Sequence, residues 1–247
     1  MIKEFFAVAL TVLIASVGLC HADRTDVMKT DQGDLEITLL GHGSLMFKFQ
    51  GKVLFVDPFS KVADYSKLPK ADVILITHEH PDHTDPAAIA KIRTDRTLLA
   101  ASKAAQEKVK DAIVMENGDT KAVGGFQVQA VPAYNIVHKR ESGQPYHPKG
   151  RGNGYVISFA NLKVYVAGDT EFIPEMKDLK GIDVAFLPVN LPYTMTAEMA
   201  AEAANAIKPR ILYPYHFAMG NTDVSKLPEL LKNVSGVELR MTDKSGK

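Results

Sequence analysis

The stretch "LITHEHPDHTD" (residues 75–85) crowds three imidazoles and two carboxylic acids into residues 78–83. It continues the apolar, β-branched run at 71–77, which predicts a strand buried on both faces. A loop that leaves the carboxyl end of such a strand is where α/β folds place their ligands. Neutral imidazoles and carboxylates together are ligands for Zn²⁺, Mn²⁺ or Fe. The stretch therefore predicts a metal site, and the alternative is a polar surface loop with coincidental histidines.

The spacing within this loop is compatible with two metal ions. His78 and His80 can face one point, while Asp82 and His83 can turn to a second point a few ångström away. Asp85 before Pro86 has an ordinary explanation, because the pair is typical of a helix start. No turn chemistry calls for three histidines, so the metal hypothesis is favoured over the surface loop.

The rest of the chain alternates short β-type runs with helical runs. This alternation predicts an α/β fold with two mixed sheets and helices outside. After a polar lead at 23–33, the expected strands are 35–40, 44–49, 52–57, 71–77, 97–101, 126–133, 154–159, 163–169, 183–189 and 210–216. The expected helices begin at Pro86 and span 102–111, 196–207 and 225–234, with Ser102 and Thr196 as N-caps.

Composition limits the partners and the number of domains. The chain has 247 residues, 46% of them hydrophobic, and 29 basic residues balance 29 acidic ones. No nucleic acid partner is expected from that balance. The apolar content is enough for a sizeable core, and no low-complexity linker interrupts the chain, so residues 23–247 are predicted to form one domain.

The N-terminus has the pattern of a secretory signal peptide. An apolar run from Phe5 to Leu19 follows Lys3 and precedes Cys20-His21-Ala22. The run is shorter than the roughly 20 residues of a membrane span, so residues 1–22 are expected to be removed, and the protein to be periplasmic or secreted without a stable membrane span. A lipoprotein cut before Cys20 and an uncleaved anchor are the alternatives. If residues 1–22 are removed, the mature chain lacks cysteine, so a metal must be held by other side chains.

Several motifs in a fixed order resemble one known family. His-x-His-x-Asp-His after a buried strand resembles the signature of the metallo-β-lactamase-fold hydrolases. The resemblance covers nearly the whole mature chain and is nearest to the branch that includes ascorbate-6-phosphate lactonase. It implies a four-layer αββα sandwich. Besides the signature, it is carried by "LLGHGSLMF" (39–47), "LFVDPF" (54–59), "VAGDTEF" (166–172), "LPVNLPYTMTAEMAAEAA" (187–204) and "LYPYHF" (212–217).

The resemblance also implies roles for single residues. Asp169 would bridge two metals and His216 would be the last histidine ligand, although each alone also reads as a turn aspartate or a core histidine. Asp57 would support a metal-bound imidazole, or simply end a strand before Pro58. His42, between two glycines, would lie behind the ligands or face the substrate. The predicted metal ligands are His78, His80, Asp82, His83, His147, Asp169 and His216.

One position departs from the commonest pattern of the family. A histidine is expected where this chain has Tyr134, followed by Asn135. Both residues are therefore expected near the site, behind the ligands or facing the substrate. His147 is the preferred replacement ligand, because Pro148 and Gly150 can fix its turn, and His138 and Asn135 are alternatives. It is also open whether a metal binds tightly only at the second position, which Asp82, His83, His216 and Asp169 would form. His147 and His138 belong to an unusually long connection, which is typical of functional loops.

The implied function is metal-dependent hydrolysis of a small, possibly anionic substrate. Two divalent ions, Zn²⁺ first with Mn²⁺ or Fe as alternatives, would hold a hydroxide that attacks a lactone, ester or phosphodiester. Asp82 would also accept a proton from the attacking water. Cations in the long loop, among them Arg140, would attract an anion, or merely be solvated. The competing hypotheses are a diiron oxidoreductase of the same fold and a non-catalytic periplasmic metal binder. The sequence does not predict an oligomeric state.

Overall fold

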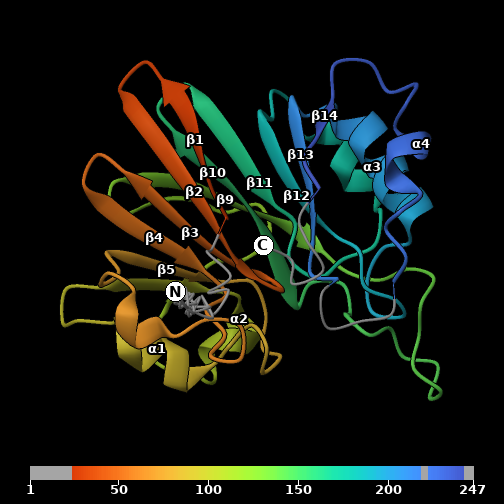
Figure 1. Ribbon diagram of the computed structural model, residues 1–247. Coiled ribbons are helices and arrows are strands. Elements are labelled where there is room, and N and C mark those ends of the chain that lie inside the picture. The colour runs from red at the N-terminus through yellow and green to blue at the C-terminus, as the bar shows by residue number, and fades with distance from the viewer. Residues whose placement is uncertain (1–23, 218–221, 242–247) are drawn as a thin grey trace, which may run out of the picture.

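Two seven-stranded sheets face each other in the computed structural model, which describes residues 24–217 and 222–241 (Figure 1). In the first sheet, β1 to β4 are antiparallel neighbours and β4 to β7 are parallel. Its strands follow chain order: β1 (Arg24–Thr30), β2 (Gly33–Gly41), β3 (Ser44–Phe49), β4 (Lys52–Val56), β5 (Val73–Ile76), β6 (Leu98–Ala101) and β7 (Ile113–Val114).

The second sheet repeats this plan. Its strands β8 to β11 are antiparallel neighbours, and β11 to β14 are parallel. Both sheets are therefore mixed, as the sequence predicts. The strands are β8 (Thr120–Val123), β9 (Phe126–Ala133), β10 (Gly152–Phe159), β11 (Leu162–Val166), β12 (Val184–Pro188), β13 (Ile211–Tyr215) and β14 (Glu238–Leu239).

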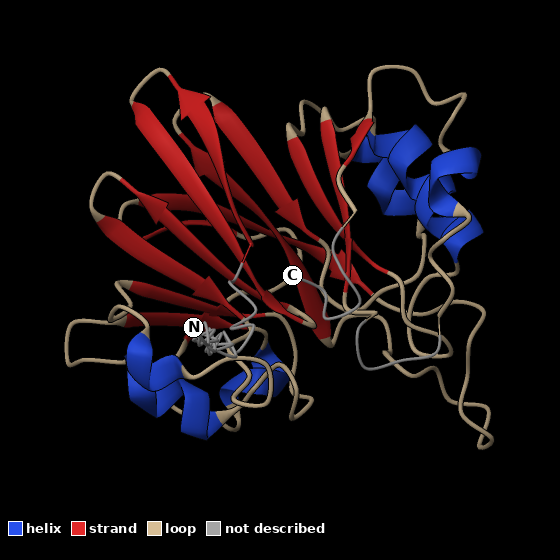
Figure 2. Cartoon of the chain, viewed as in Figure 1, coloured by secondary structure: helices blue, strands red, loops and turns tan. Residues whose placement is uncertain are grey.

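Helices lie outside the two sheets, so the expected four-layer αββα sandwich is confirmed. Figure 2 shows helices beside the outer face of each sheet, and the four α-helices of the described residues form two pairs. The first pair is α1 (Pro86–Ile92) and α2 (Lys103–Gln106), and the second is α3 (Ala197–Ile207) and α4 (Leu227–Leu230). Two short 3₁₀ helices, η1 (Tyr65–Lys67) and η2 (Pro174–Asp178), lie in connections.

Three apolar layers hold these elements together. The central layer lies between the sheets, where Phe47 from β3 packs against Phe159 from β10 with ring centroids 5.3 Å apart. Two outer layers bury the helices against the sheets. In α3 the alanines at 200, 203 and 204 are buried, and they share one of these outer layers with Ala185 and Leu187 of β12.

The helix starts form as expected. The Asp85 carboxylate accepts hydrogen bonds from the amides of Ala87 and Ala88 at the start of α1. Thr196 accepts one from Met199 at the start of α3, and Ser102 accepts one from Ala105. Each cap satisfies amides that the first turn leaves unpaired.

The structure has four strands that the sequence analysis did not expect, β1, β7, β8 and β14, and two of its helices are shorter than expected. The polar lead contains β1, whose alternation buries Met28 while Val27 stays exposed, as on an edge strand. The helix expected at 102–111 ends at Gln106, and the one expected at 225–234 spans only 227–230. Each forms little more than a single turn, and so short a helix gains too little from its own hydrogen bonds to extend without packing.

Within the residues that the structure describes, no helix is long and apolar enough to cross a membrane. The expected signal peptide at 1–22 lies outside the described residues.

Candidate metal centre

The predicted site residues meet at one edge of the sandwich, where strands from both sheets end. Asp57 follows β4, the loop 78–83 follows β5, Asp169 follows β11 and His216 follows β13. His42 lies in the turn between β2 and β3. Asp57, His42 and His216 adopt positive φ of 46°, 50° and 66°. Such left-handed backbone costs about 1–3 kcal/mol per residue and gathers at functional sites.

Six of the eight histidines of the chain form two clusters with two aspartates. Within each cluster, one ligand atom from every residue lies within 4.8 Å of the others. The first cluster contains His78, His80, His147 and Asp169. The second contains His42, Asp82, His83 and His216.

In the first cluster, three imidazole nitrogens converge. Nε2 of His78 lies 3.1 Å from Nδ1 of His80, which lies 3.2 Å from Nε2 of His147. Ligand atoms around a tetrahedral zinc ion, about 2.0 Å from it, lie roughly 3.3 Å apart. The nitrogens therefore have the separation that one divalent ion requires.

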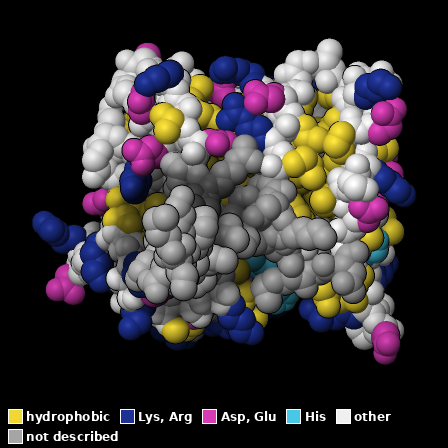
Figure 3. All heavy atoms as spheres, in the orientation of Figure 1, with side chains coloured by type: hydrophobic (Ala, Val, Ile, Leu, Met, Phe, Trp, Pro, Cys, Tyr) yellow, Lys and Arg dark blue, Asp and Glu magenta, His cyan; other side chains and the backbone are white. Residues whose placement is uncertain are grey.

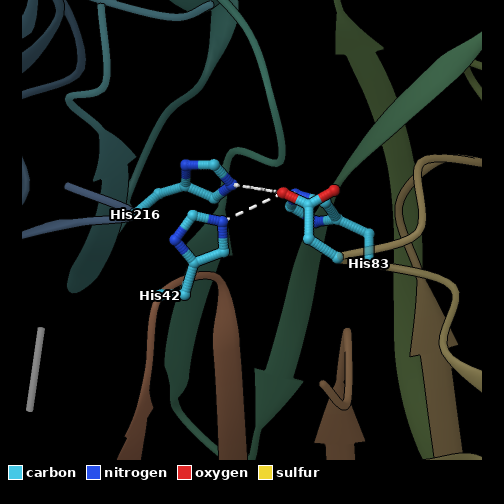
Figure 4. Close-up of side chains that lie close together, drawn as sticks. His42, His83 and His216 are labelled. Atoms are coloured by element: carbon cyan, nitrogen blue, oxygen red, sulfur yellow. Dashed lines mark hydrogen bonds and ion pairs between the residues drawn. The ribbon is translucent and has the colours of Figure 1, made fainter. Parts of the chain in front are cut away.

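The second cluster brings together side chains that are far apart in the sequence. Nε2 of His83 lies 2.9 Å from Nε2 of His216, and Nε2 of His42 lies 3.0 Å from Oδ2 of Asp82. The rings of His42 and His216 lie against each other, with centroids 3.7 Å apart, beside His83 (Figure 4). His42 thus lies among the possible ligand donors of this cluster, whereas the sequence left open whether it lies behind the ligands or faces the substrate.

The Asp169 carboxylate stands between the clusters. Its Oδ2 lies 3.2 Å from Nε2 of His147, and its Oδ1 lies 3.3 Å from Nε2 of His216 and 3.4 Å from Nε2 of His83. Oδ1 is buried without a hydrogen bond. A buried carboxylate oxygen without a hydrogen bond is costly, and a cation held by the second cluster would satisfy this one.

Each of three imidazoles is held from behind by a hydrogen bond at its other nitrogen. Nδ1 of His83 lies 2.7 Å from the Asp57 carboxylate, and Nδ1 of His147 lies 2.7 Å from Oδ1 of Asn135. Nδ1 of His78 lies 3.0 Å from the hydroxyl of Thr77, which itself donates to Asp57. With the Nδ1 protons so placed, the Nε2 lone pairs face the cluster, as in metal-ligating histidines.

Burial and charge set the protonation of the centre. Burial lowers the pKa of His78 well below its usual value, and the nearby His83 lowers it further. Burial raises the pKa of Asp169, but the positive potential of His216 and His83 outweighs it, so the carboxyl stays ionised. Neutral His78 and ionised Asp169 are the forms that bind metals. Burial lowers the pKa of His83, but the carboxylates of Asp169, Asp57 and Asp82 outweigh burial and raise it well above its usual value, so this ring must release a proton to bind a metal.

Gly43 is one reason why the second cluster can be so tight. A Cβ atom at this position would lie 3.0 Å from Cε1 of His83 and 3.1 Å from Cδ2 of His216. Any side chain at residue 43 would therefore displace one of the two rings.

The long connection delivers His147 to the first cluster, while the other candidates from this loop lie elsewhere. The Tyr134 hydroxyl donates to Glu175 at 2.9 Å, outside both clusters. His138 lies 2.6 Å from the Glu171 carboxylate. Asn135 contacts His147 rather than joining the ligand set.

A cavity of about 740 Å³ opens over both clusters. Its walls include the aromatic rings of Tyr146 and Tyr193, whose centroids are 5.0 Å apart, and the cation Arg140. Arg140 lies over the Tyr146 ring, at 5.1 Å from its centroid. Two other loop cations are paired: Lys149 with Glu175 and Arg151 with Glu79.

Sequence reasoning missed several residues that shape this centre. Thr77 supports His78 and Asp57, and the Asn190 amide lies 3.3 Å from Nδ1 of His216. Asn190 stands in the motif at 187–204, which was the only signal for it. Glu171 lies in the motif at 166–172, but no pattern in the sequence distinguishes it as functional.

Comparisons with known proteins agree with this geometry. Residues 36–216 match the family model described as beta-lactamase superfamily domain. A crystal structure of a metal-dependent hydrolase from Parabacteroides distasonis is 48% identical, with a TM-score of 0.84, over 90% of this chain and 99% of that one. A metal-dependent hydrolase from Pyrococcus abyssi is 33% identical over 82% of this chain and 92% of its own length.

A more distant structure shares the fold. CmlA, a diiron beta-hydroxylase from Streptomyces venezuelae, is 18% identical with a TM-score of 0.67, over 86% of this chain and 53% of that one. The family match and the two closer relatives establish that this chain belongs to the beta-lactamase superfamily, among its metal-dependent hydrolases.

Proposed function

We propose that the protein is a dinuclear hydrolase that cleaves a lactone, ester or phosphodiester bond in a small molecule. The observation that carries the proposal is the Asp169 carboxylate, whose two oxygens face two separate four-residue donor clusters. When bound, two divalent ions lower the pKa of a water molecule and polarise the substrate oxygen.

The donor set favours zinc over harder metals. Six imidazoles and two carboxylates make up the clusters, and imidazole suits Zn²⁺ or Fe, whereas Mg²⁺ and Ca²⁺ prefer oxygen ligands. We therefore propose two Zn²⁺ ions. The likeness to the diiron hydroxylase concerns the fold, and no contact among the residues that the structure describes favours oxidation over hydrolysis.

Other residues of the chain orient the imidazoles, take up a proton and line the cavity. Asp57, Asn135 and Thr77 keep His83, His147 and His78 in fixed orientations, so the donors need little rearrangement. Asp82 is 33% exposed whereas Asp169 is 4% exposed, so Asp82 is the carboxylate placed to take up a proton at the cavity floor. The Tyr146 and Tyr193 rings line the cavity and exclude water from one side of a bound substrate.

We further propose that the substrate carries an anionic group. Arg140 lines the cavity and its guanidinium is stacked on Tyr146, while no carboxylate is paired with it among the described residues. Arg140→Gln should raise KM for anionic substrates several-fold and leave neutral ones unchanged. Arg151→Gln is the matched control, because Glu79 already pairs with that cation. Equal effects of both substitutions would refute the role of Arg140.

The test of the function is a metal-loaded activity panel of lactones, nitrophenyl esters, phosphodiesters and β-lactams. The zinc-loaded protein should hydrolyse at least one of the first three classes. His80→Ala should abolish that turnover and leave the fold intact. Glu79→Gln, which changes the neighbouring residue outside both clusters, should retain it. Full activity of His80→Ala would contradict the proposal.

We also propose that the protein is exported, on the sequence of residues 1–22 alone. N-terminal sequencing of the mature protein after expression with its full chain tests this. A mature terminus at residue 23 is expected, and an intact Met1 in the cytoplasmic fraction would refute it.

A further inference from the structure

Glu171 is a carboxylate that the hydrolytic mechanism does not use, although it is fully buried. It follows β11, two residues after Asp169. Neither of its oxygens faces a cluster: both are turned toward the start of the long loop, residues 134–151.

The surroundings of this carboxylate form a complete cage of donors. Oε2 accepts the backbone amides of Ile136 and Val137 at 2.6 and 2.7 Å. Oε1 accepts the backbone amide of His138 at 2.6 Å and the side-chain amide of Asn135 at 3.1 Å, and it lies 2.6 Å from Nδ1 of His138. Five donors on one buried carboxylate fix the backbone of three consecutive residues and the Asn135 side chain.

Asn135 connects the Glu171 carboxylate to His147, which is a member of the first cluster. Its Oδ1 lies 2.7 Å from Nδ1 of His147 and accepts the His147 amide at 3.2 Å. The backbone amide of Asn135 donates to the His147 carbonyl at 2.8 Å. The orientation of the Asn135 side chain is set by its Nδ2, which donates to Glu171 and to the carbonyl of Tyr193 at 2.9 Å.

We propose that Glu171 is a positioning residue that selects the ligand orientation of His147 through Asn135, and so sets metal affinity in the first cluster. The proposal rests on the two-metal function above, but its test measures metal binding without any substrate. Because a glutamine offers an N–H₂ group where the cage needs an acceptor, Glu171→Gln breaks at least two of the five hydrogen bonds.

Glu175→Gln is the matched control. Glu175 lies on the same segment and also ties down the long loop, through Lys149 at 2.7 Å and the Tyr134 hydroxyl at 2.9 Å. It has no hydrogen bond to Asn135 or His147 among the described residues. If any side chain that holds the long loop in place could set zinc affinity, Glu171→Gln and Glu175→Gln would weaken zinc binding equally.

The experiment is a titration of the metal-free full chain with Zn²⁺ against a competing chelator. Glu171→Gln should weaken one of two zinc equivalents by about 10–100-fold, the usual effect of an outer hydrogen-bond partner of a ligand. The other equivalent should stay within threefold. Glu175→Gln should leave both unchanged. Titration with Co²⁺ should show altered visible absorption for one equivalent only.

A second measurement tests the path through Asn135. Asn135→Ala alone should weaken the same equivalent, and adding Glu171→Gln to it should produce little further loss, because both act through one contact. Additive losses would show that Glu171 acts elsewhere.

Three further results would overturn the proposal. They are unchanged zinc affinity in Glu171→Gln, equal loss in Glu175→Gln, and failure of both Glu171→Gln and the milder Glu171→Asp to fold, which would make the residue purely structural. A wild-type chain that binds two zinc ions but hydrolyses nothing would refute the proposed function and leave this inference standing.

Discussion

Asp57 lies fully buried against His83, with 2.7 Å between the carboxylate oxygen and Nδ1 of the ring. The carboxylate also accepts the backbone amide and the hydroxyl of Thr77 at 2.8 and 2.6 Å. The residue after β4 is thereby joined to Thr77 and to the histidine loop after β5, and Nε2 of His83 is left to face the second cluster.

Asp57→Asn should weaken metal binding in this second cluster. The amide is nearly isosteric, but it lacks the charge that makes the His83 ring more basic, and a loss of about 10–100-fold in zinc affinity is expected. Chelator competition measures it. Asp72→Asn is the control, because Asp72 lies just before the opposite end of β5, and among the described residues its carboxylate accepts a hydrogen bond from the Val53 amide alone. Unchanged affinity in Asp57→Asn would contradict the role of the carboxylate.

His147→Ala should remove one zinc equivalent and reduce kcat/KM at least about 100-fold, because the first cluster keeps only His78, His80 and Asp169. Tyr134→Phe should change neither quantity, because the hydroxyl contacts Glu175 and Lys149. Metal analysis and steady-state kinetics on the two variants show which of the two residues is needed for metal binding and turnover. If Tyr134→Phe lost metal while His147→Ala kept it, the assignment of His147 would be wrong.

These residues also show how far a single sequence can predict the site. His78, Asp82 and His83 are recognisable because no turn chemistry needs them, and Asp169 and His216 because they end buried strands in motifs of the right order. Strand ends of a sandwich converge, so the topology brings such residues together.

The parts of the site and fold that the sequence does not predict depend on three-dimensional packing. The sequence favours His147 over His138 as a ligand only through the turn at Pro148 and Gly150, and it takes the fold of residues 134–151 to place His147 in a cluster. Glu171 carries no local pattern, because its five donors belong to a segment far away in the chain. Strand β1 was missed because an edge strand needs few apolar residues, and only its pairing with β2 reveals it.

Phe47→Ala should destabilise the fold by about 3–5 kcal/mol, the usual cost of truncating a buried phenylalanine. The ring is fully buried between the two sheets, and its centroid lies 5.3 Å from that of Phe159 and 6.2 Å from that of Phe186. Urea denaturation of metal-free protein measures the loss. Leu98→Ala, at a side chain that is 41% exposed, should cost under about 1 kcal/mol. A similar cost for both would argue against a shared core.

Tyr65 gives a prediction about alkaline pH. Burial raises its pKa from 10.0 to about 12, and its hydroxyl oxygen accepts the amide of Phe59 at 2.9 Å. Because the folded pKa is higher, the unfolded state releases this proton first. The stability that the neutral hydroxyl contributes is complete below pH 10 and is lost as pH rises from 10 to about 12.

Over that window the free energy of unfolding should fall with pH by about 1.4 kcal/mol per unit for this group. Tyr65→Phe should show a slope that is smaller by one proton, although loss of the acceptor for Phe59 costs about 1 kcal/mol at neutral pH. Denaturation curves at several pH values provide the slopes. Identical slopes in the two proteins would show that Tyr65 titrates normally.

The number of zinc ions per chain, measured by equilibrium dialysis and elemental analysis, tests the central claim most directly. The wild-type protein should bind two ions tightly. Asp169→Asn should bind at most one, because the neutral amide cannot offer an anionic oxygen to each cluster. Two tightly bound ions in Asp169→Asn, or fewer than two in the wild type, would contradict a shared carboxylate between paired metal sites.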